Sequence, residues 1–213
     1  MIQLPLAKNV TRVLCLGAHS DDIEIGLGGT ILRMIEENPK LEVTWVCFGG
    51  DETRKREARE SAEKILAPLE KKTILTQGFR DAYFPTEMDK IKDFFETFKA
   101  FDPQLIFTHF KEDAHQDHRT INQLTWNTFR GHLILEYEIL KYDGDLGRPN
   151  AYIAIPERLA QRKVDHLMEA FPTQAKRQWY SPDTFWGMMR IRGVEANSPT
   201  KFAEAFHARK IVF

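Results

Sequence analysis

The stretch RVLCLGAHSDDIEIGLGGTI, residues 12–31, decides how this chain folds. Its first six residues are mostly apolar, which predicts a buried strand over residues 12–17. The segment AHSDD (residues 18–22) follows directly, and a glycine-rich run then opens a predicted helix over residues 26–37. Desolvating an ionised carboxylate is costly unless it is paired or bound to a cation. The adjacent aspartates therefore either belong to a polar loop that caps the helix or hold something positive.

The rest of the chain repeats this alternation of strand and helix. Predicted strands cover residues 12–17, 41–48, 72–76, 104–108, 133–139 and 151–155, and predicted helices cover residues 26–37, 53–67, 86–100, 118–130 and 156–169. Residues 203–213 are predicted to be extended. Such alternation favours an α/β, Rossmann-like, mostly parallel sheet with helices on both faces. We expect residues 1–213 to form a single domain, with the last ~60 residues as an elaboration on the sheet.

Composition excludes several classes of function. The 213 residues carry a formal net charge of −1, which gives no global attraction to nucleic acid. Cys15 and Cys47 lie inside apolar runs and are predicted to be buried free thiols. The N-terminal segment lacks the pattern of a signal peptide, and we find no apolar run near the ~20 residues of a membrane span. The expected location is the cytoplasm.

A second cluster of acidic and imidazole groups follows the predicted strand at 104–108. It reads HFKEDAHQDH, residues 109–118, and holds three of the seven histidines of the chain. In a doubly wound sheet ordered 3-2-1-4-5, strands 1 and 4 are neighbours at the switch point, and the loops after them flank the ligand crevice. The two clusters should therefore meet at one edge of the sheet.

The combined cluster suits metal-assisted hydrolysis of an acyl bond. Two imidazoles and one carboxylate suffice to hold a catalytic divalent metal with an open position for water. The mixed nitrogen and oxygen donors favour zinc, although iron, manganese or cobalt could occupy similar ligands. A remaining carboxylate could take a proton from the water, and a spare histidine could donate to a developing oxyanion.

At these residues the sequence resembles the LmbE/PIG-L-type zinc-dependent de-N-acetylases. The family motif of Ala-His-Pro-Asp-Asp before a glycine-rich helix start, with a distant His-x-Asp-His, is similar to residues 18–30 and 115–118 here. The resemblance extends to Arg-x-x-Glu at 54–57, to Asp81 and to AEAF at 203–206, and so covers nearly the whole chain. Ser20 stands where proline is commonest in the family; because this position is not a ligand, we expect the serine to be tolerated.

The resemblance implies a role for each matching residue. It assigns the metal to His19, Asp22 and His118. It makes Asp21 the general base and His115 the group that stabilises the oxyanion, with Asp113 orienting that histidine. Arg54 and Asp81 match positions associated with substrate contact or support of the site, and Arg56 is an alternative to Arg54.

Simpler interpretations remain for the other residues of the two clusters. Asp117 is predicted to orient a turn or cap a helix, and His109 to be a satisfied histidine at the end of a strand. The three glycines at 26, 28 and 29 are predicted to allow close approach of helix and sheet, because the spacing is not that of a phosphate loop and the neighbouring acids would repel phosphate.

The function expected from the resemblance is removal of an acetyl group from an N-acetylated amine, most simply an N-acetylglucosamine-type sugar conjugate. Two alternatives stay open: a non-catalytic sugar or nucleotide binder on the same fold, and an amidase that acts on a non-sugar amide. The expected partner is a small molecule, with no nucleic acid and no membrane span, and a homo-oligomer is compatible with the sequence.

Overall fold

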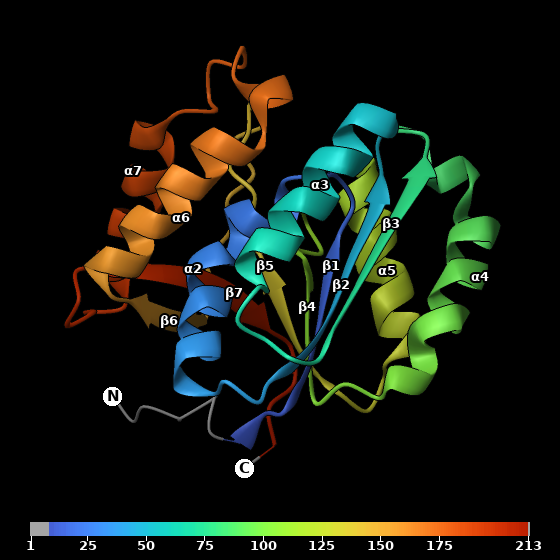
Figure 1. Ribbon diagram of the computed structural model, residues 1–213, viewed down its shortest axis with the longest axis horizontal. Coiled ribbons are helices and arrows are strands. Elements are labelled where there is room, and N and C mark those ends of the chain that lie inside the picture. Colours follow the sequence, from blue (N-terminus) through green and yellow to red (C-terminus); the bar gives the residue numbers. More distant parts are fainter. Residues whose placement is uncertain (1–8, 213) are drawn as a thin grey trace.

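The computed structural model describes residues 9–212, which form one α/β domain around a seven-stranded sheet (Figure 1). The strands are β1 (Arg12–Gly17), β2 (Glu42–Gly49), β3 (Lys72–Phe79), β4 (Leu105–His109), β5 (Leu133–Tyr137), β6 (Ala151–Ile155) and β7 (Phe202–Ala208). The helices are α2 (Asp22–Glu37), α3 (Glu52–Ile65), α4 (Met88–Phe98), α5 (Gln116–Thr128), α6 (Glu157–Ala170) and α7 (Pro182–Glu195). The predictions about the extreme N-terminus fall largely on residues 1–8, outside the described residues.

The sheet has the order β3-β2-β1-β4-β5-β7-β6. Its first five strands are parallel, and β7 is antiparallel to both β5 and β6. This confirms the mostly parallel sheet and the predicted adjacency of the first and fourth strands. Because β1 and β4 run side by side in the same direction, the segments that follow Gly17 and His109 leave the same edge of the sheet.

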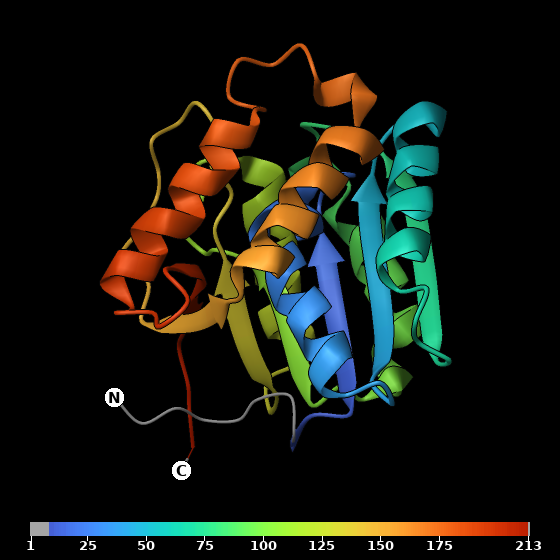
Figure 2. The same ribbon diagram turned by 60° about the vertical axis from the view of Figure 1, so that its left-hand side comes forward.

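Helices cover both faces of the sheet, as predicted (Figures 1 and 2). α2, α3, α6 and α7 pack on one face, and α4 and α5 pack on the other. Alternate residues of β1 serve the two layers: Val13 and Cys15 join the first core, whereas Leu14 and Leu16 join the second. Burial on both faces explains why the strand reads as an almost continuous apolar run. Cys15 and Cys47 are buried free thiols, also as predicted.

The main departures from the predicted elements lie at their boundaries. The helix expected from residue 26 begins already at Asp22 and is bent at Leu27, where φ is −147° and ψ is 18°. The acidic pair is therefore the helix start itself, where carboxylates are favoured by the backbone amides and the helix dipole. The extended segment predicted over 203–213 is strand only as far as Ala208. α7 was not delimited from the sequence. Within residues 9–212 no helix is long and apolar enough to cross a membrane.

The glycines of α2 make the close approach that the sequence predicted. A Cβ on Gly26 would lie 2.2 Å from Cδ2 of the buried Tyr137 ring. Gly26→Ala should therefore lower the free energy of unfolding by about 1–3 kcal/mol through overpacking. Denaturant melts compared with Gly187→Ala test this, because Gly187 of α7 has no atom within 4 Å of its would-be Cβ. That control should be neutral or stabilising by up to about 1 kcal/mol, and equal losses in both variants would contradict the packing argument.

Candidate metal and catalytic site

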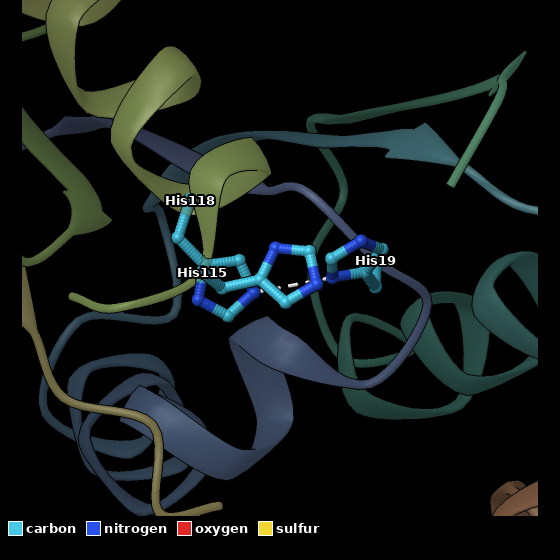
Figure 3. Close-up of side chains that lie close together, drawn as sticks. All are labelled: His19, His115 and His118. Carbon is cyan, nitrogen blue, oxygen red and sulfur yellow. Dashed lines mark hydrogen bonds between the residues drawn. The ribbon is translucent and has the colours of Figure 1, made fainter. Parts of the chain in front are cut away.

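The two sequence clusters meet at the edge of the sheet where β1 and β4 end. His19 comes from the segment between β1 and α2, whereas His115 and His118 come from the beginning of α5. Figure 3 shows the three rings converging. The ring of His19 lies 4.8 Å from that of His115 and 5.1 Å from that of His118, measured between centroids. The convergence predicted from strand order is therefore present.

Three donor atoms form the centre of the site. His19 Nδ1 lies 3.1 Å from His118 Nε2 and 3.4 Å from Asp22 Oδ2. His118 Nε2 lies 3.5 Å from Asp22 Oδ2. Zinc bonds of about 2.0–2.1 Å place the ligand atoms of a tetrahedral shell about 3.3 Å apart. The three atoms thus have the spacing that one zinc ion requires. They belong to the three residues that the resemblance implies as ligands.

Hydrogen bonds on the outer nitrogens of the two histidines direct their inner nitrogens, His118 Nε2 and His19 Nδ1, toward the centre of the site. His118 Nδ1 lies 2.9 Å from Asp113 Oδ2, so the ring donates there and keeps a lone pair on Nε2. Burial lowers the pKa of His118 to about 4, which keeps the ring neutral. His19 Nε2 faces two carboxylates, Asp81 Oδ1 at 3.1 Å and Asp117 Oδ2 at 3.3 Å. A proton on that nitrogen leaves Nδ1 of His19 as a donor to a metal.

The trio attracts positive charge. Burial alone lowers the pKa of His19, but the carboxylates of Asp22, Asp117 and Asp81 outweigh it and raise that pKa well above its usual value. Burial alone raises the pKa of Asp22, but the surrounding histidines hold it well below its usual value. Either a second proton on His19 or a divalent cation would supply the positive charge that these carboxylates favour. The donor set therefore fits a metal.

Asp21 stands beside the trio and is held by Arg54. The Nη2 atom of Arg54 lies 3.3 Å from Asp21 Oδ1, and its Nη1 atom lies 3.2 Å from Asp81 Oδ2. Burial and the neighbouring Asp22 raise the pKa of Asp21 to about 6, close to the range useful to a general base. Arg56, the alternative at this position, is exposed to solvent. The site therefore contains Arg54.

Ser20 has a contact that the sequence did not suggest. Its hydroxyl oxygen accepts a hydrogen bond from Arg54 Nε at 3.1 Å. A proline at this position would offer no such acceptor. The serine therefore helps to hold Arg54, in addition to being tolerated at this position.

His115 is placed to donate a hydrogen bond. As the residue that caps α5, it accepts the backbone N–H of Asp117 on its Nδ1 at 3.2 Å. The proton of the neutral ring must then lie on Nε2. Burial and the nearby His19 lower the pKa of His115, so the neutral form is favoured.

Asp113 contacts a different histidine from the one expected. Its Oδ2 is bound to the His118 ring, and its Oδ1 accepts the backbone N–H of His115 at 2.8 Å and lies 3.0 Å from Lys141 Nζ. Burial alone raises the pKa of Asp113, but His118 and Lys141 hold it below its usual range. A carboxylate on the outer nitrogen of a metal-binding histidine fixes the ring and its tautomer. Asp113 therefore orients the ring of His118, and it touches His115 through the backbone.

His109 has more contacts with the site than its interpretation as a satisfied histidine suggested. It is fully buried and stacks on His118 with 3.9 Å between ring centroids. Its Nε2 accepts the Ala18 backbone N–H at 2.9 Å and lies 3.3 Å from Asp22 Oδ2. His109 could form another ligand group with Asp22 and His118. Its Nε2 accepts from Ala18, but its buried Nδ1 has no hydrogen-bond partner among the described residues, so the ring is not fully satisfied.

Asp117 orients a turn, as the sequence suggested. Its two oxygens accept the backbone N–H groups of Ala82, at 2.6 Å, and Phe84, at 3.1 Å. It thereby ties the segment after β3, which carries Asp81, to the beginning of α5. The sequence predicted a local turn, but the turn that Asp117 holds lies more than thirty residues away.

Comparison with solved structures gives the same fold with several chemistries. N,N'-diacetylchitobiose deacetylase from Pyrococcus horikoshii is 22% identical with a TM-score of 0.71, over 94% of this chain and 84% of that one. The A40926 pseudoaglycone deacetylase Dbv21 is 16% identical with a TM-score of 0.71, over 96% and 100%. GalB, the 4-carboxy-2-hydroxymuconate hydratase from Pseudomonas putida, is 16% identical with a TM-score of 0.74, over 95% and 98%. At these identities the likeness shows the fold alone, and the fold does not select a reaction.

The sequence itself carries a family match. The family model described as PIG-L: GlcNAc-PI de-N-acetylase matches residues 14–129, more than half of the chain. The matched region includes both clusters, from the segment after β1 to the beginning of α5. The chain belongs to the PIG-L family.

Proposed function

We propose that the protein is a zinc-dependent de-N-acetylase that hydrolyses the amide bond of an N-acetylated amine. The observation that carries the proposal is the close spacing of the three donor atoms of His19, Asp22 and His118, with Asp21 and His115 beside them. Two nitrogens and one oxygen at this spacing favour zinc, and iron, manganese or cobalt remain alternatives. Membership of the PIG-L family supports a deacetylase.

Each protein group has a distinct task in the reaction. A divalent cation, when bound, would polarise the acetyl carbonyl and acidify water. Asp21 accepts a proton from the attacking water, and Arg54 keeps its carboxylate in place. The Nε2–H of His115 donates to the oxygen that becomes negative as the tetrahedral carbon forms. The amide C–N bond then breaks, Asp21 returns the proton it took from water to the departing amine, and the products are acetate and a free amine.

The proposed substrate is an N-acetylglucosamine-type sugar conjugate. Two observations support a sugar: the family description names a GlcNAc de-N-acetylase, and one structural neighbour is a diacetylchitobiose deacetylase. Asp81 is the proposed contact for a substrate hydroxyl, because its carboxylate is half-exposed beside the site. One of its oxygens binds His19 and the other binds Arg54. These two bonds hold the carboxylate in a fixed orientation.

The direct test is acetate release from a panel of N-acetylated sugar conjugates and non-sugar amides. We expect release from at least one sugar conjugate, loss of activity with an excess of chelator, and recovery on adding zinc. Activity that survives complete removal of metal would exclude the mechanism. Release of acetate from non-sugar amides alone would identify an amidase. A protein that binds no stoichiometric zinc would instead favour a non-catalytic binder.

A further inference from the structure

Helix α2 is interrupted close to the candidate site. Leu27 has non-helical backbone angles, so the first turn, which begins at Asp22, is set at an angle to the rest of the helix. Kinks of this kind arise where a side chain enters the ladder of hydrogen bonds between residues i and i−4. Asp21 and Asp22 thus stand on a short segment whose direction must be set by something other than the remainder of α2.

A buried ion pair supplies the hydrogen bonds at this kink. Glu204 of β7 accepts the backbone N–H of Gly29 on Oε1 at 2.9 Å and that of Thr30 on Oε2 at 2.6 Å. Lys163 of α6 donates to the carbonyl oxygen of Ile25 at 2.6 Å, the acceptor that a regular helix offers to Gly29. The carboxylate therefore caps the second part of the helix, and the ammonium caps the first.

The two charges satisfy each other as well as the helix. Lys163 Nζ lies 2.6 Å from Glu204 Oε1, and their side chains are 4% and 3% exposed. A buried pair is costly unless further hydrogen bonds satisfy it, and here the helix backbone provides them. Gly29 leaves room for this arrangement, because its would-be Cβ would lie 3.2 Å from Glu204 Oε1. The kink, the glycines and the AEAF segment are thus parts of one structure.

We propose that Lys163 and Glu204 are positioning residues that fix the first turn of α2 and thereby aim the carboxylates of Asp21 and Asp22. Neither touches the donor atoms of the site, and both act through the backbone of Ile25, Gly29 and Thr30. The inference rests on the proposed function, in which Asp22 binds the metal and Asp21 takes a proton from the attacking water.

The test is Glu204→Gln, which keeps the shape of the side chain but turns an N–H donor toward a backbone N–H. We expect zinc to bind at least about tenfold more weakly, as is typical when the support of a ligand is removed. The substrate KM should stay within about twofold while kcat falls, because the substrate does not touch Glu204. Hydrogen exchange of the peptide covering residues 22–30 should become faster.

The matched control is Glu138→Gln. Glu138 forms another buried ion pair, with Arg192 Nη2 of α7 at 2.7 Å. Both of these residues line the cavity that Lys163 and Glu204 also line. If Glu138→Gln weakens zinc binding as much as Glu204→Gln does, the effect is general destabilisation and the positioning role is wrong. Lys163→Met provides a second variant should Glu204→Gln not fold, and it should weaken zinc binding more than the control does.

The same titrations separate this inference from the proposed function. A wild-type protein that binds no zinc would overturn the proposed function. Wild-type binding with an unchanged zinc Kd in both Glu204→Gln and Lys163→Met would overturn the positioning role and leave the proposed function standing.

Discussion

Asp22→Asn is expected to weaken zinc binding by more than about a hundredfold, beyond the 10–100-fold usual for residues that only support a ligand. Asp22 supplies the carboxylate of the donor trio, and the same oxygen accepts the backbone N–H of His19 at 2.6 Å. The substitution removes a negative charge that faces His19, His109 and His118 at 3.3–3.5 Å. Competition with a chromophoric chelator measures the change, and acetate release should fall with it.

Glu24→Gln is a suitable control for that variant. Glu24 is buried on the same first turns of α2, but its carboxyl group bonds to Ser61. Burial raises the pKa of Glu24 to about 8, so the group is mostly protonated at neutral pH and glutamine resembles it closely. Zinc binding should change little in this variant. An equal loss in both would mean that any buried amide on α2 disturbs the site, and Asp22 would lose its assignment as a ligand.

The sheet and the meeting of the two clusters were predictable because both depend on local patterns and one general rule. Buried parallel strands read as apolar runs, and the carboxyl ends of neighbouring strands share an edge. Because β1 and β4 are neighbours, residues 18–22 and 109–118 lie together. The motif resemblance then implied which of these polar groups are metal ligands, which spacing alone does not do.

The partner of Asp113 was less predictable because it depends on where a helix begins. His115 caps α5 in an extended conformation, with φ −74° and ψ 122°, whereas His118 lies inside the first turn. That difference turns the ring of His118 toward Asp113 Oδ2 and leaves His115 with only a backbone contact. Helix boundaries are the least certain part of a sequence-based prediction, and one turn decides which imidazole faces the carboxylate.

The early beginning of α2 has a different cause. The glycines suggested a helix start at residue 26, but Lys163 and Glu204 allow helix on both sides of a kink at Leu27. These two residues lie more than a hundred positions away from the helix that they support. Their role arises from the packing of α6 and β7 on α2. The sequence around the glycines therefore does not predict the helix before the kink.

Asp21→Asn should lower kcat by about 10²–10⁴-fold, the usual contribution of a positioned general base, while zinc binding stays within a few-fold of wild type. Asparagine keeps an oxygen that can accept from Arg54 Nη2, so the geometry of the loop should survive. What is lost is the capacity to take a proton from the attacking water. Asp51→Asn is the matched control, because Asp51 caps α3 by accepting the Arg54 backbone N–H and asparagine caps equally well. Retained metal with unimpaired hydrolysis in Asp21→Asn would remove Asp21 as the base, whereas loss of both metal and activity would make it part of the metal site.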